Sequence, residues 1–214
     1  MKLYTFPTAP NPRRVHLYLA EKGLEVPCET VDIMTRQNRT PEFMAKRNPL
    51  GGLPVLELDD GSHIAESVAI CRYFEVLHPE PALFGTSAEE QGRIEMWSRR
   101  IELNLMRPVG MVWVHGSPLT KGVVKEQLPE AAEQNRGIVR DFYRFLDKEL
   151  SRREFIAGDA FTIADILALT TIDFAGSLVE LPFDPKLEGL AAWHERVSAR
   201  PSVKSHPSPG GLGG

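Results

Sequence analysis

Residues 48–70 read NPLGGLPVLELDDGSHIAESVAI, and this stretch decides the fold of the N-terminal part of the chain. Two short apolar runs, 54–58 and 62–64, flank Asp59-Asp60-Gly61, a combination that predicts a β-hairpin. A helix is expected directly afterwards, from about Ser67 to Leu77, because the apolar spacing becomes helical. The stretch therefore predicts a strand–strand–helix unit.

The residues before this stretch predict a strand–helix–strand unit. Leu3–Phe6 and Val26–Ile33 are the candidate strands, and apolar residues at helical spacing lie between them. We expect Asn11 to cap this helix and Pro12 to occupy its first position. The two strands should be parallel, with a right-handed crossover. A βαβ unit followed by a ββα unit is the layout of a thioredoxin-like α/β domain, which we place at residues 1–80.

The sequence that follows a Pro-rich linker at 78–81 predicts only helices. From about residue 87 to 204, apolar residues recur at helical spacing, and no convincing strand is found. Pro108 should bend or end the first of these helices, and Thr162–Asp165 resembles a capping box. We therefore expect an all-helical domain at 87–204. The tail, 205–214, is rich in Pro, Gly and Ser and is expected to be disordered.

Composition and charge exclude several kinds of partner. The formal net charge of −4 argues against nucleic acid and against anionic membranes. No apolar run approaches the roughly 20 residues of a membrane helix, and the N-terminus leaves no room for a signal peptide's apolar core. Cys28 and Cys71 form no CxxC pair, and the six histidines show no metal-ligand spacing. We expect a cytoplasmic protein that binds no metal, no nucleic acid and no membrane.

Four segments of the chain, in the expected order, resemble the cytosolic glutathione S-transferase family. They are 48–56, 64–70, 155–165 and 200–203. Around 8–22 and 112–117 the chain is most similar to the atypical fungal-type and bacterial transferases, which lack the usual catalytic Tyr, Ser or Cys. The resemblance implies a thioredoxin-like domain that binds glutathione and an all-α domain that supplies a second-substrate pocket. It also implies a homodimer, with glutathione as co-substrate and no further cofactor.

The resemblance implies glutathione-binding roles for residues on either side of the hairpin. The bond between Leu53 and Pro54 is expected to be cis, so that the main chain of Leu53 pairs with the cysteinyl unit of glutathione like an added strand. Ser67 and its helix N-terminus would hold the γ-glutamyl carboxylate, and Glu66 would pair with the ammonium group. The structural alternatives are a plain turn proline at Pro54 and an N-cap at Ser67.

The glycine carboxylate of glutathione needs a cation from the polar stretch between the two units. Arg36, Arg39 and Lys46 are available there. Gly52 stands where many family members carry Lys or Gln, which favours Arg36 or Arg39 as the carboxylate partner. Such residues are also common on solvated surfaces.

Activation of the thiol is the step for which the sequence leaves alternatives open. A cysteine-like thiol has a pKa of about 8.5, and lowering it by about two units needs about 2.7 kcal/mol of thiolate stabilisation. A helix N-terminus supplies about 0.3–2 kcal/mol, and one charge-assisted hydrogen bond supplies about 1.5–3 kcal/mol. Thr8, Asn11 and His115 are the candidate donors, and Tyr4 is a weaker one that also fits a core position.

The helical domain carries apolar residues suited to a hydrophobic second substrate, although each also fits an ordinary core. They are Met106, Val109, Met111, Val112, Trp113 and Phe174. Arg93, Arg99 and Arg100 lie on the first long helix and are candidates for the homodimer interface or for a solvated face.

The function expected from these observations is detoxifying conjugation of the glutathione thiolate to hydrophobic electrophiles. One alternative is a glutathione-binding or regulatory module of the same fold without catalysis. Another is a glutathione-dependent reductase, which needs a cysteine beside the first helix, where residues 8–11 contain none.

Overall fold

The computed structural model describes residues 1–208, which form two compact units. The first comprises Met1–Leu83 together with Ser205–Pro207, and the second comprises Phe84–Lys204 and Ser208. None of the described helices is long and apolar enough to cross a membrane. The two units are described separately below.

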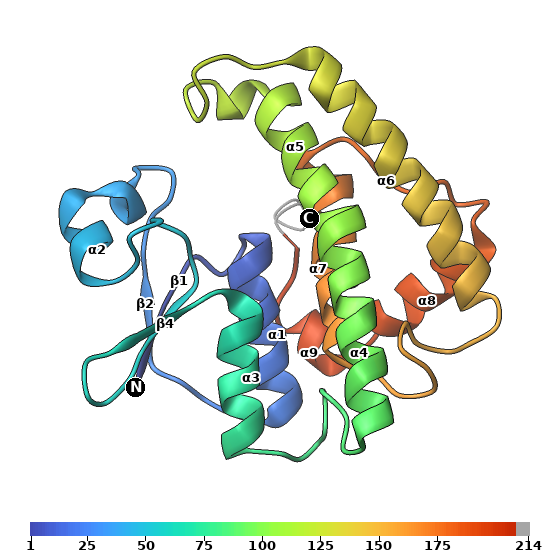
Figure 1. Cartoon of the computed structure of the whole chain (residues 1–214), viewed down its shortest axis with the longest axis horizontal. Helices are drawn as coiled ribbons and strands as arrows, with labels where there is room; N and C mark the ends of the chain where they lie inside the picture. The colour runs from blue at the N-terminus through green and yellow to red at the C-terminus, as the bar shows by residue number, and fades with distance from the viewer. Residues whose placement is uncertain (209–214) are drawn as a thin grey trace. The chain divides into compact units, whose positions relative to one another are not determined.

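The first unit is a four-stranded sheet with helices (Figure 1). Its elements are β1 (Lys2–Thr5), α1 (Pro10–Lys22), β2 (Cys28–Thr30), the 3₁₀ turn η1 (Gln37–Arg39), α2 (Pro41–Lys46), β3 (Val55–Glu57), β4 (His63–Ala65) and α3 (Ser67–Leu77). The strand order is β2-β1-β3-β4, in which β1 and β2 are parallel and the other pairs are antiparallel. The predicted thioredoxin-like layout and the hairpin are confirmed.

Side chains of β1 alternate between the two faces of the sheet, as a strand requires. The Thr5 hydroxyl lies 2.8 Å from Nε2 of His16 on α1. Tyr4, its neighbour, packs edge-on against Phe43 of α2, with Val55 in the same buried cluster. Helices α1 and α2 therefore cover opposite faces, and α3 packs beside α1 (Figure 1).

Helix α1 begins earlier than predicted. Its N-cap is Ala9, in an extended conformation, and Pro10 rather than Pro12 opens the helix. The Ala9 N–H donates to the carbonyl of Phe6, so the turn is complete before Asn11 is reached. Asn11 is therefore a helical residue and not the cap, which corrects the sequence prediction; proline suits either position because its missing N–H has no partner in the first turn.

The observed bounds of β2 and α3 can be compared with the predicted ones. Strand β2 has only three residues, all exposed, at the edge of the sheet, and Val31, which follows it, lies in the buried cluster with Phe43. Helix α3 has the predicted bounds, but Glu66 is its N-cap and Ser67 is its first helical residue.

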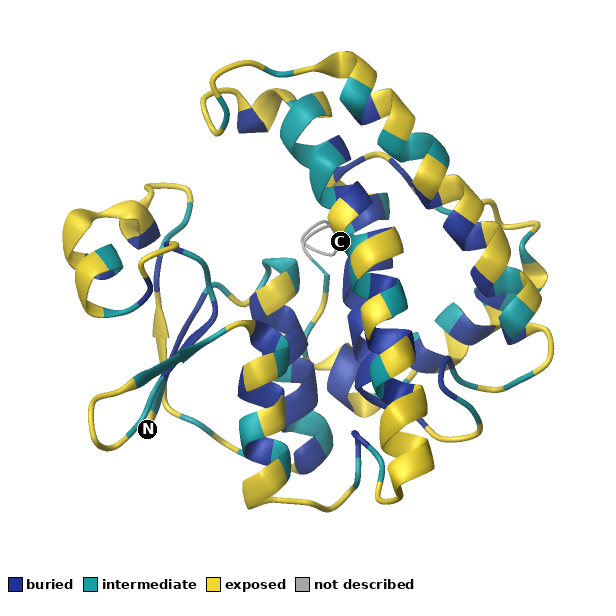
Figure 2. Cartoon of the chain, in the orientation of Figure 1, coloured by how far each residue is buried: buried dark blue, intermediate teal, exposed yellow. Residues whose placement is uncertain are grey.

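The second unit is all-helical over its described residues, as predicted. It contains α4 (Ala88–Ile101), the π-helical turn η2 (Glu102–Met106), α5 (Arg107–Gly116), the 3₁₀ turn η3 (Pro118–Thr120), α6 (Pro129–Leu150), α7 (Ile163–Leu178), α8 (Glu188–Ser198) and α9 (Pro201–Lys204). The π-helical turn comes just before Pro108, which has no N–H for the regular pattern and whose ring crowds the preceding turn. Most of α7 is buried, and it forms the centre of this unit (Figure 2).

The predicted capping box at the start of α7 is present. Oδ2 of Asp165 accepts hydrogen bonds from the N–H and the hydroxyl of Thr162. Oδ1 of the same carboxyl accepts from the N–H of Ile156 and from Nε1 of Trp193 on α8. One fully buried carboxyl therefore caps α7 and also joins it to a loop and to α8.

The C-terminal tail is described only as far as Ser208. His206 belongs to the first unit, where its carbonyl accepts from Nε of Arg13 and its ring stacks on His16 at 5.7 Å between centroids. Of the tail that the sequence predicted to be disordered, 205–214, the part 209–214 lies outside the described residues.

Candidate functional site

The loop before β3 is fixed by side chains that sequence reasoning did not single out. Asn38, which is buried, donates from Nδ2 to the carbonyl of Gly51 at 2.6 Å. Asn48 donates in the same way to the carbonyl of Gly52 at 3.0 Å. Gly51 has φ +61°, and a Cβ there would lie 2.7 Å from the carbonyl oxygen of Asn38. Glycine is therefore required at this position both by conformation and by space.

The bond between Leu53 and Pro54 is cis, as predicted. Leu53 lies just outside β3, and neither its N–H nor its C=O has a main-chain hydrogen-bond partner among the described residues. These two groups are thus available to an extended peptide at the end of the loop.

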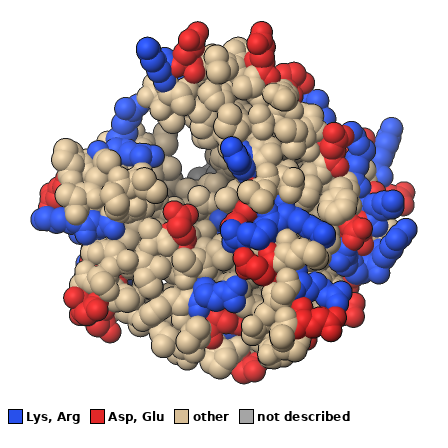
Figure 3. Space-filling view, viewed as in Figure 1, with Lys and Arg blue, Asp and Glu red and all other residues tan. Residues whose placement is uncertain are grey.

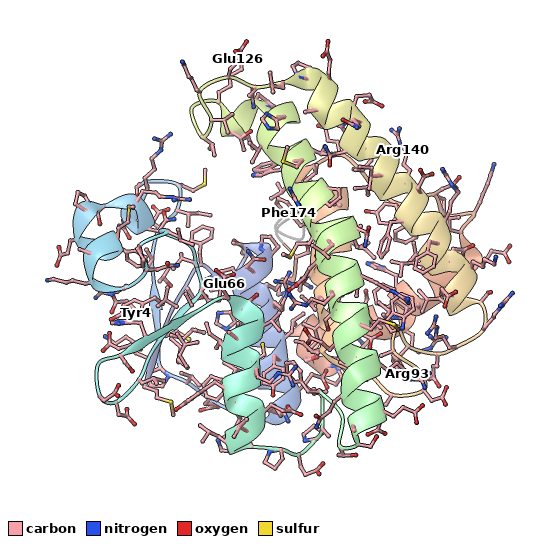
Figure 4. The ribbon with its side chains drawn as sticks, in the orientation of Figure 1. Tyr4, Glu66, Arg93, Glu126, Arg140 and Phe174 are labelled. Carbon is pink, nitrogen blue, oxygen red and sulfur yellow. The ribbon has the colours of Figure 1, made fainter. Side chains whose placement is uncertain are left out.

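The N-terminus of α3 combines a strained residue with a buried hydroxyl. Glu66 is exposed and has φ +69°, a left-handed conformation that is costly for a non-glycine residue and that concentrates at functional sites. Ser67 is buried, and its hydroxyl accepts a hydrogen bond of 2.8 Å from Nη1 of Arg14. Figure 4 places Glu66 at this end of α3. The free N–H groups of the first turn make the position favourable for a carboxylate.

Arg14 joins the first turn of α1 to the first turn of α3. It is only 1% exposed, and Nη1 also donates to Oδ1 of Asn11 at 3.0 Å. The spacing Asn11–Arg14 is one helical turn, so the sequence could have indicated that pair, but nothing local indicates the bond to Ser67. Because Oδ1 of Asn11 accepts from Arg14, the Asn11 amide nitrogen is directed away from Arg14 and remains a donor.

The other candidate donors of the first unit, Thr8 and Tyr4, differ in whether their hydroxyl groups already make hydrogen bonds. Thr8 is half-buried in the turn before α1, and its hydroxyl makes no hydrogen bond to another described residue. Tyr4 is buried, its hydroxyl donates to Oε2 of Glu57 at 2.6 Å, and Nη2 of Arg47 donates to it (Figure 4). Tyr4 is therefore a core residue on the α2 face of the sheet and not a free donor.

The predicted cations take three different positions. Arg39 donates from Nη1 to the carbonyl of Leu50 at 2.7 Å, and its side chain lies against Gly51. Arg36 is exposed in a left-handed turn just before η1. Lys46 pairs with Glu42 one turn earlier on α2, with both side chains mostly in solvent. Of the three, Arg39 has the only side chain fixed on the loop that precedes the cis proline.

Neither cysteine is poised to react as a thiolate. Cys71 is fully buried on α3, and this burial raises the pKa of its thiol well above the ordinary range. Cys28 lies on the edge strand β2, and desolvation of its thiol by neighbouring atoms likewise raises its pKa. A reductase mechanism through a cysteine of this chain finds no support in these environments.

In the second unit, His115 has one ring nitrogen engaged. Nδ1 accepts a hydrogen bond of 3.3 Å from the N–H of Leu128, the residue that precedes α6. In the neutral imidazole the proton must then be on Nε2, which is a donor. The side chain is half-buried near the C-terminal end of α5.

The predicted apolar pocket residues separate into two groups. Trp113 and Phe174 are half-buried and meet edge to face, with 5.3 Å between ring centroids; Figure 4 labels Phe174. Met106 is also half-buried. Val109 and Val112 are 1% and 0% exposed, because they face the interior of the unit at α-helical spacing. These two occupy core positions, which is the alternative that the sequence left open. Val112 also borders a cavity of about 60 Å³.

The arginines of α4 pair with acids of their own helix. Arg93 and Arg99 each form an ion pair with a glutamate one turn earlier, Glu89 and Glu95 (Figure 4). Arg100 lies over the ring of Trp97 at 4.8 Å. On the face drawn in Figure 3, basic and acidic side chains are interspersed.

Comparison with known proteins agrees with this arrangement. The family model "Glutathione S-transferase, N-terminal domain" matches residues 3–82, and "Glutathione S-transferase, C-terminal domain" matches 109–201. The chain belongs to the glutathione S-transferase family. Glutathione S-transferase 2 of Saccharomyces cerevisiae is 38% identical over 207 residues, which are 95% of this chain and 88% of the relative.

Solved structures of other glutathione S-transferases have the same fold over nearly the whole chain. The crystal structure of Gtt2 from Saccharomyces cerevisiae has a TM-score of 0.91 at 37% identity and covers 97% of this chain and 100% of that one. A glutathione S-transferase domain-containing protein from Marinobacter aquaeolei has a TM-score of 0.89 at 38% identity, with 95% and 100% covered. The predicted similarity to fungal-type and bacterial transferases is confirmed. The chain is a glutathione transferase.

Within the first unit, several of the predicted site residues are held by side-chain hydrogen bonds. Ser67 and Asn11 share the guanidinium of Arg14, and Arg39 supports the loop that leads to Leu53 and its cis proline. Sequence reasoning missed Arg14 and Asn38, because their partners lie 53 and 13 residues away along the chain.

Proposed function

We propose that this glutathione transferase conjugates the glutathione thiolate to hydrophobic electrophiles. The observation that carries the proposal is the link from Ser67 through Arg14 to Asn11, since it connects a carboxylate-binding helix N-terminus with the first turn of α1. Catalysis then consists of holding the tripeptide, stabilising its thiolate and placing it near the electrophile, and the attack itself is made by sulfur. No metal and no cofactor beyond glutathione is required.

Each end of glutathione has a partner of suitable charge in this proposal. The γ-glutamyl carboxylate binds the α3 N-terminus and the Ser67 hydroxyl, while Glu66 pairs with the ammonium group. The cysteinyl unit pairs with the N–H and C=O of Leu53. Arg39, with Arg36 as the alternative, receives the glycine carboxylate; Arg39 is favoured because it already lies on the loop at Gly51.

Three donors remain candidates for the thiolate. The N-terminus of α1 contributes its dipole, and Thr8 and Asn11 lie at that end with donor capacity left over. His115 supplies an Nε2–H, since its Nδ1 is already an acceptor. A neutral imidazole donor stabilises a thiolate without taking its proton.

The electrophile is proposed to be hydrophobic because of the half-buried apolar side chains of the second unit. Trp113 and Phe174 present ring faces and edges, and Met106 adds a flexible thioether that adapts to varied shapes.

Ultraviolet absorbance of the thiolate tests the proposal. Glutathione titrated with the protein near neutral pH should give a saturable thiolate band, and Ser67→Ala and Glu66→Ala should weaken its saturation. Turnover with an aryl halide series should rise with hydrophobicity, and Phe174→Ala should flatten that trend without changing the band. Absence of the band despite measured binding would contradict thiolate stabilisation by this chain.

We further infer a cytoplasmic homodimer, as is usual for the family. Val76 and Leu77 on α3 and Leu103 in the π-helical turn are large apolar side chains exposed on a single chain, which a second copy would cover. Light scattering should give twice the mass of one chain, and Val76→Glu should reduce it. Cell fractionation should place the protein in the cytosol.

A further inference from the structure

The loop that connects α5 to α6 is bound to the end of α5 by a glutamine side chain. Nε2 of Gln127 lies 2.9 Å from the carbonyl oxygen of Val114 and 2.7 Å from that of Ser117. It lies 3.0 Å from the hydroxyl oxygen of Thr120. The last carbonyls of a helix have no partner within the helix, so the amide supplies donors that α5 otherwise lacks. With acceptors on all sides, the nitrogen and not the oxygen of the amide must point this way.

Thr120 completes the same network from inside. It is 4% exposed, and its hydroxyl is 2.9 Å from the carbonyl of Trp113 and 2.8 Å from that of Ser117. The hydroxyl donates its single proton to one of these carbonyls and accepts from Gln127. The loop is thus held to α5 by two side chains that satisfy each other.

The residue after Gln127 acts directly on the candidate catalytic histidine. The N–H of Leu128 donates to Nδ1 of His115, and Leu128 directly follows Gln127, whose side chain is bonded to the end of α5. This bond selects the tautomer with the proton on Nε2. The alternative tautomer would present a lone pair from Nε2, which repels a thiolate.

We propose that Gln127 is a positioning residue for the transferase reaction, which fixes the Nε2–H tautomer and the ring orientation of His115 through the Leu128 amide. The inference rests on the proposed function, in which His115 donates to the glutathione thiolate. Gln127 touches neither substrate in this proposal. Its loss should therefore lower kcat and leave KM for glutathione unchanged.

The readout specific to positioning is the imidazole nitrogen spectrum. Protein labelled with ¹⁵N-histidine is studied at about pH 8, where an ordinary imidazole is neutral, and His115→Asn identifies the His115 signals. The native protein should show a pyridine-type Nδ1 and a pyrrole-type Nε2. Gln127→Ala should move both shifts toward the average of the two tautomers. Gln134→Ala, an exposed glutamine on α6, is the matched control and should change nothing.

Kinetics separate the inference from the proposed function. Gln127→Ala should reduce kcat by about two- to tenfold, the usual range for one hydrogen bond, and should have no further effect in the His115→Asn background. Thr120→Val, which removes the other half of the network, should reproduce both the spectral change and the kinetic change, and Thr120→Ser should restore them.

The outcomes are distinct. If His115→Asn leaves the thiolate band and kcat unchanged, the role of His115 in the proposed function is wrong, and the positioning inference falls with it. If His115→Asn lowers kcat but Gln127→Ala alters neither the nitrogen shifts nor kcat, the proposed function stands and only the positioning inference is overturned. Equal reductions by Gln127→Ala in both backgrounds would also overturn it.

Discussion

Nη1 of Arg14, on α1, donates a hydrogen bond of 2.8 Å to Oγ of Ser67, the first residue of α3. Both residues are buried, and they are 53 positions apart in the chain. The bond fixes the orientation of the hydroxyl at the helix N-terminus that is proposed to hold the γ-glutamyl carboxylate. The arginine also places a positive charge beside that position, where it attracts an anion.

Replacement of Arg14 should therefore weaken glutathione binding. Arg14→Met keeps the length of the side chain but removes the hydrogen bonds to Ser67 and Asn11, each of the charged kind that contributes about 1.5–3 kcal/mol. We expect at least a tenfold rise in the dissociation constant for glutathione, measured by calorimetry. Arg72→Met, on the exposed side of α3, is the control and should bind normally. Unchanged affinity in Arg14→Met would show that Ser67 needs no support from α1.

The loop at Gly51 should not tolerate a side chain. In Gly51→Ala the new Cβ would meet the carbonyl oxygen of Asn38 at 2.7 Å, in a backbone conformation that disfavours alanine. Gly61→Ala is the matched control, because Gly61 also has positive φ but has nothing within 4 Å of its Cβ position. Both should lose about 1 kcal/mol of stability from the backbone. Only Gly51→Ala should also weaken glutathione binding, and equal binding by the two variants would contradict the close contact.

In the buried ion pair of Lys22 and Glu75, each charge offsets the cost of burying the other, so removal of one partner should destabilise the first unit. Nζ of Lys22 lies 2.6 Å from Oε2 of Glu75 and also donates to the carbonyls of His78 and Pro79. Lys22→Met leaves a mostly buried carboxylate without its cation and should cost about 3–5 kcal/mol in the free energy of unfolding. Urea unfolding measures this loss. Combined with Glu75→Gln, the same change should cost clearly less than the sum of the single variants; strict additivity would mean that the pair is not coupled.

The N-terminus of α4 gives a prediction for acid. Glu90 accepts hydrogen bonds from the main-chain N–H groups of Thr86 and Ser87, and these lower the pKa of its carboxyl to about 2. Since the folded-state pKa is below the unfolded one, the stabilisation is fully present above the unfolded pKa, near 4.3. It is lost as the pH falls from there toward about 2.

Melting temperatures measured between pH 2 and pH 6 test this prediction, because this range spans the folded-state pKa of about 2 and the unfolded-state pKa of Glu90. The native protein should lose more stability on acidification than Glu90→Gln, so the two curves should converge at the acid end. Glu130→Gln, in the first turn of α6, is the control for a glutamate whose side chain makes no hydrogen bond to another described residue. Parallel curves for the native protein and Glu90→Gln would contradict the assignment.

Sequence reasoning succeeded where structure is set by neighbours along the chain. The hairpin turn at Asp59-Asp60-Gly61, the bounds of α3, and the capping box of Thr162 and Asp165 all depend on residues within a few positions of one another. The cis bond before Pro54 came from the resemblance to a family and not from the local pattern.

Other features were decided by packing. In α6, Ile138 and Phe145 are 41% and 38% exposed, whereas the neighbouring Val139 and Tyr143 are buried. Periodicity defines a helical stripe only to within about one residue, and the neighbouring helices select which residues face inward. Val109 and Val112, whose apolar character fitted either a pocket or the core, are buried.

The sequence by itself determined the two-part architecture and the family, because turn chemistry, helical periodicity and family motifs are written in short segments. Only the tertiary structure decided that Arg14 supports Ser67, that Asn38 fixes Gly51, and that Leu128 engages His115. These are single hydrogen bonds between distant or differently folded segments. Their partners become neighbours only when the sheet and the helices have packed, and no local pattern encodes that proximity.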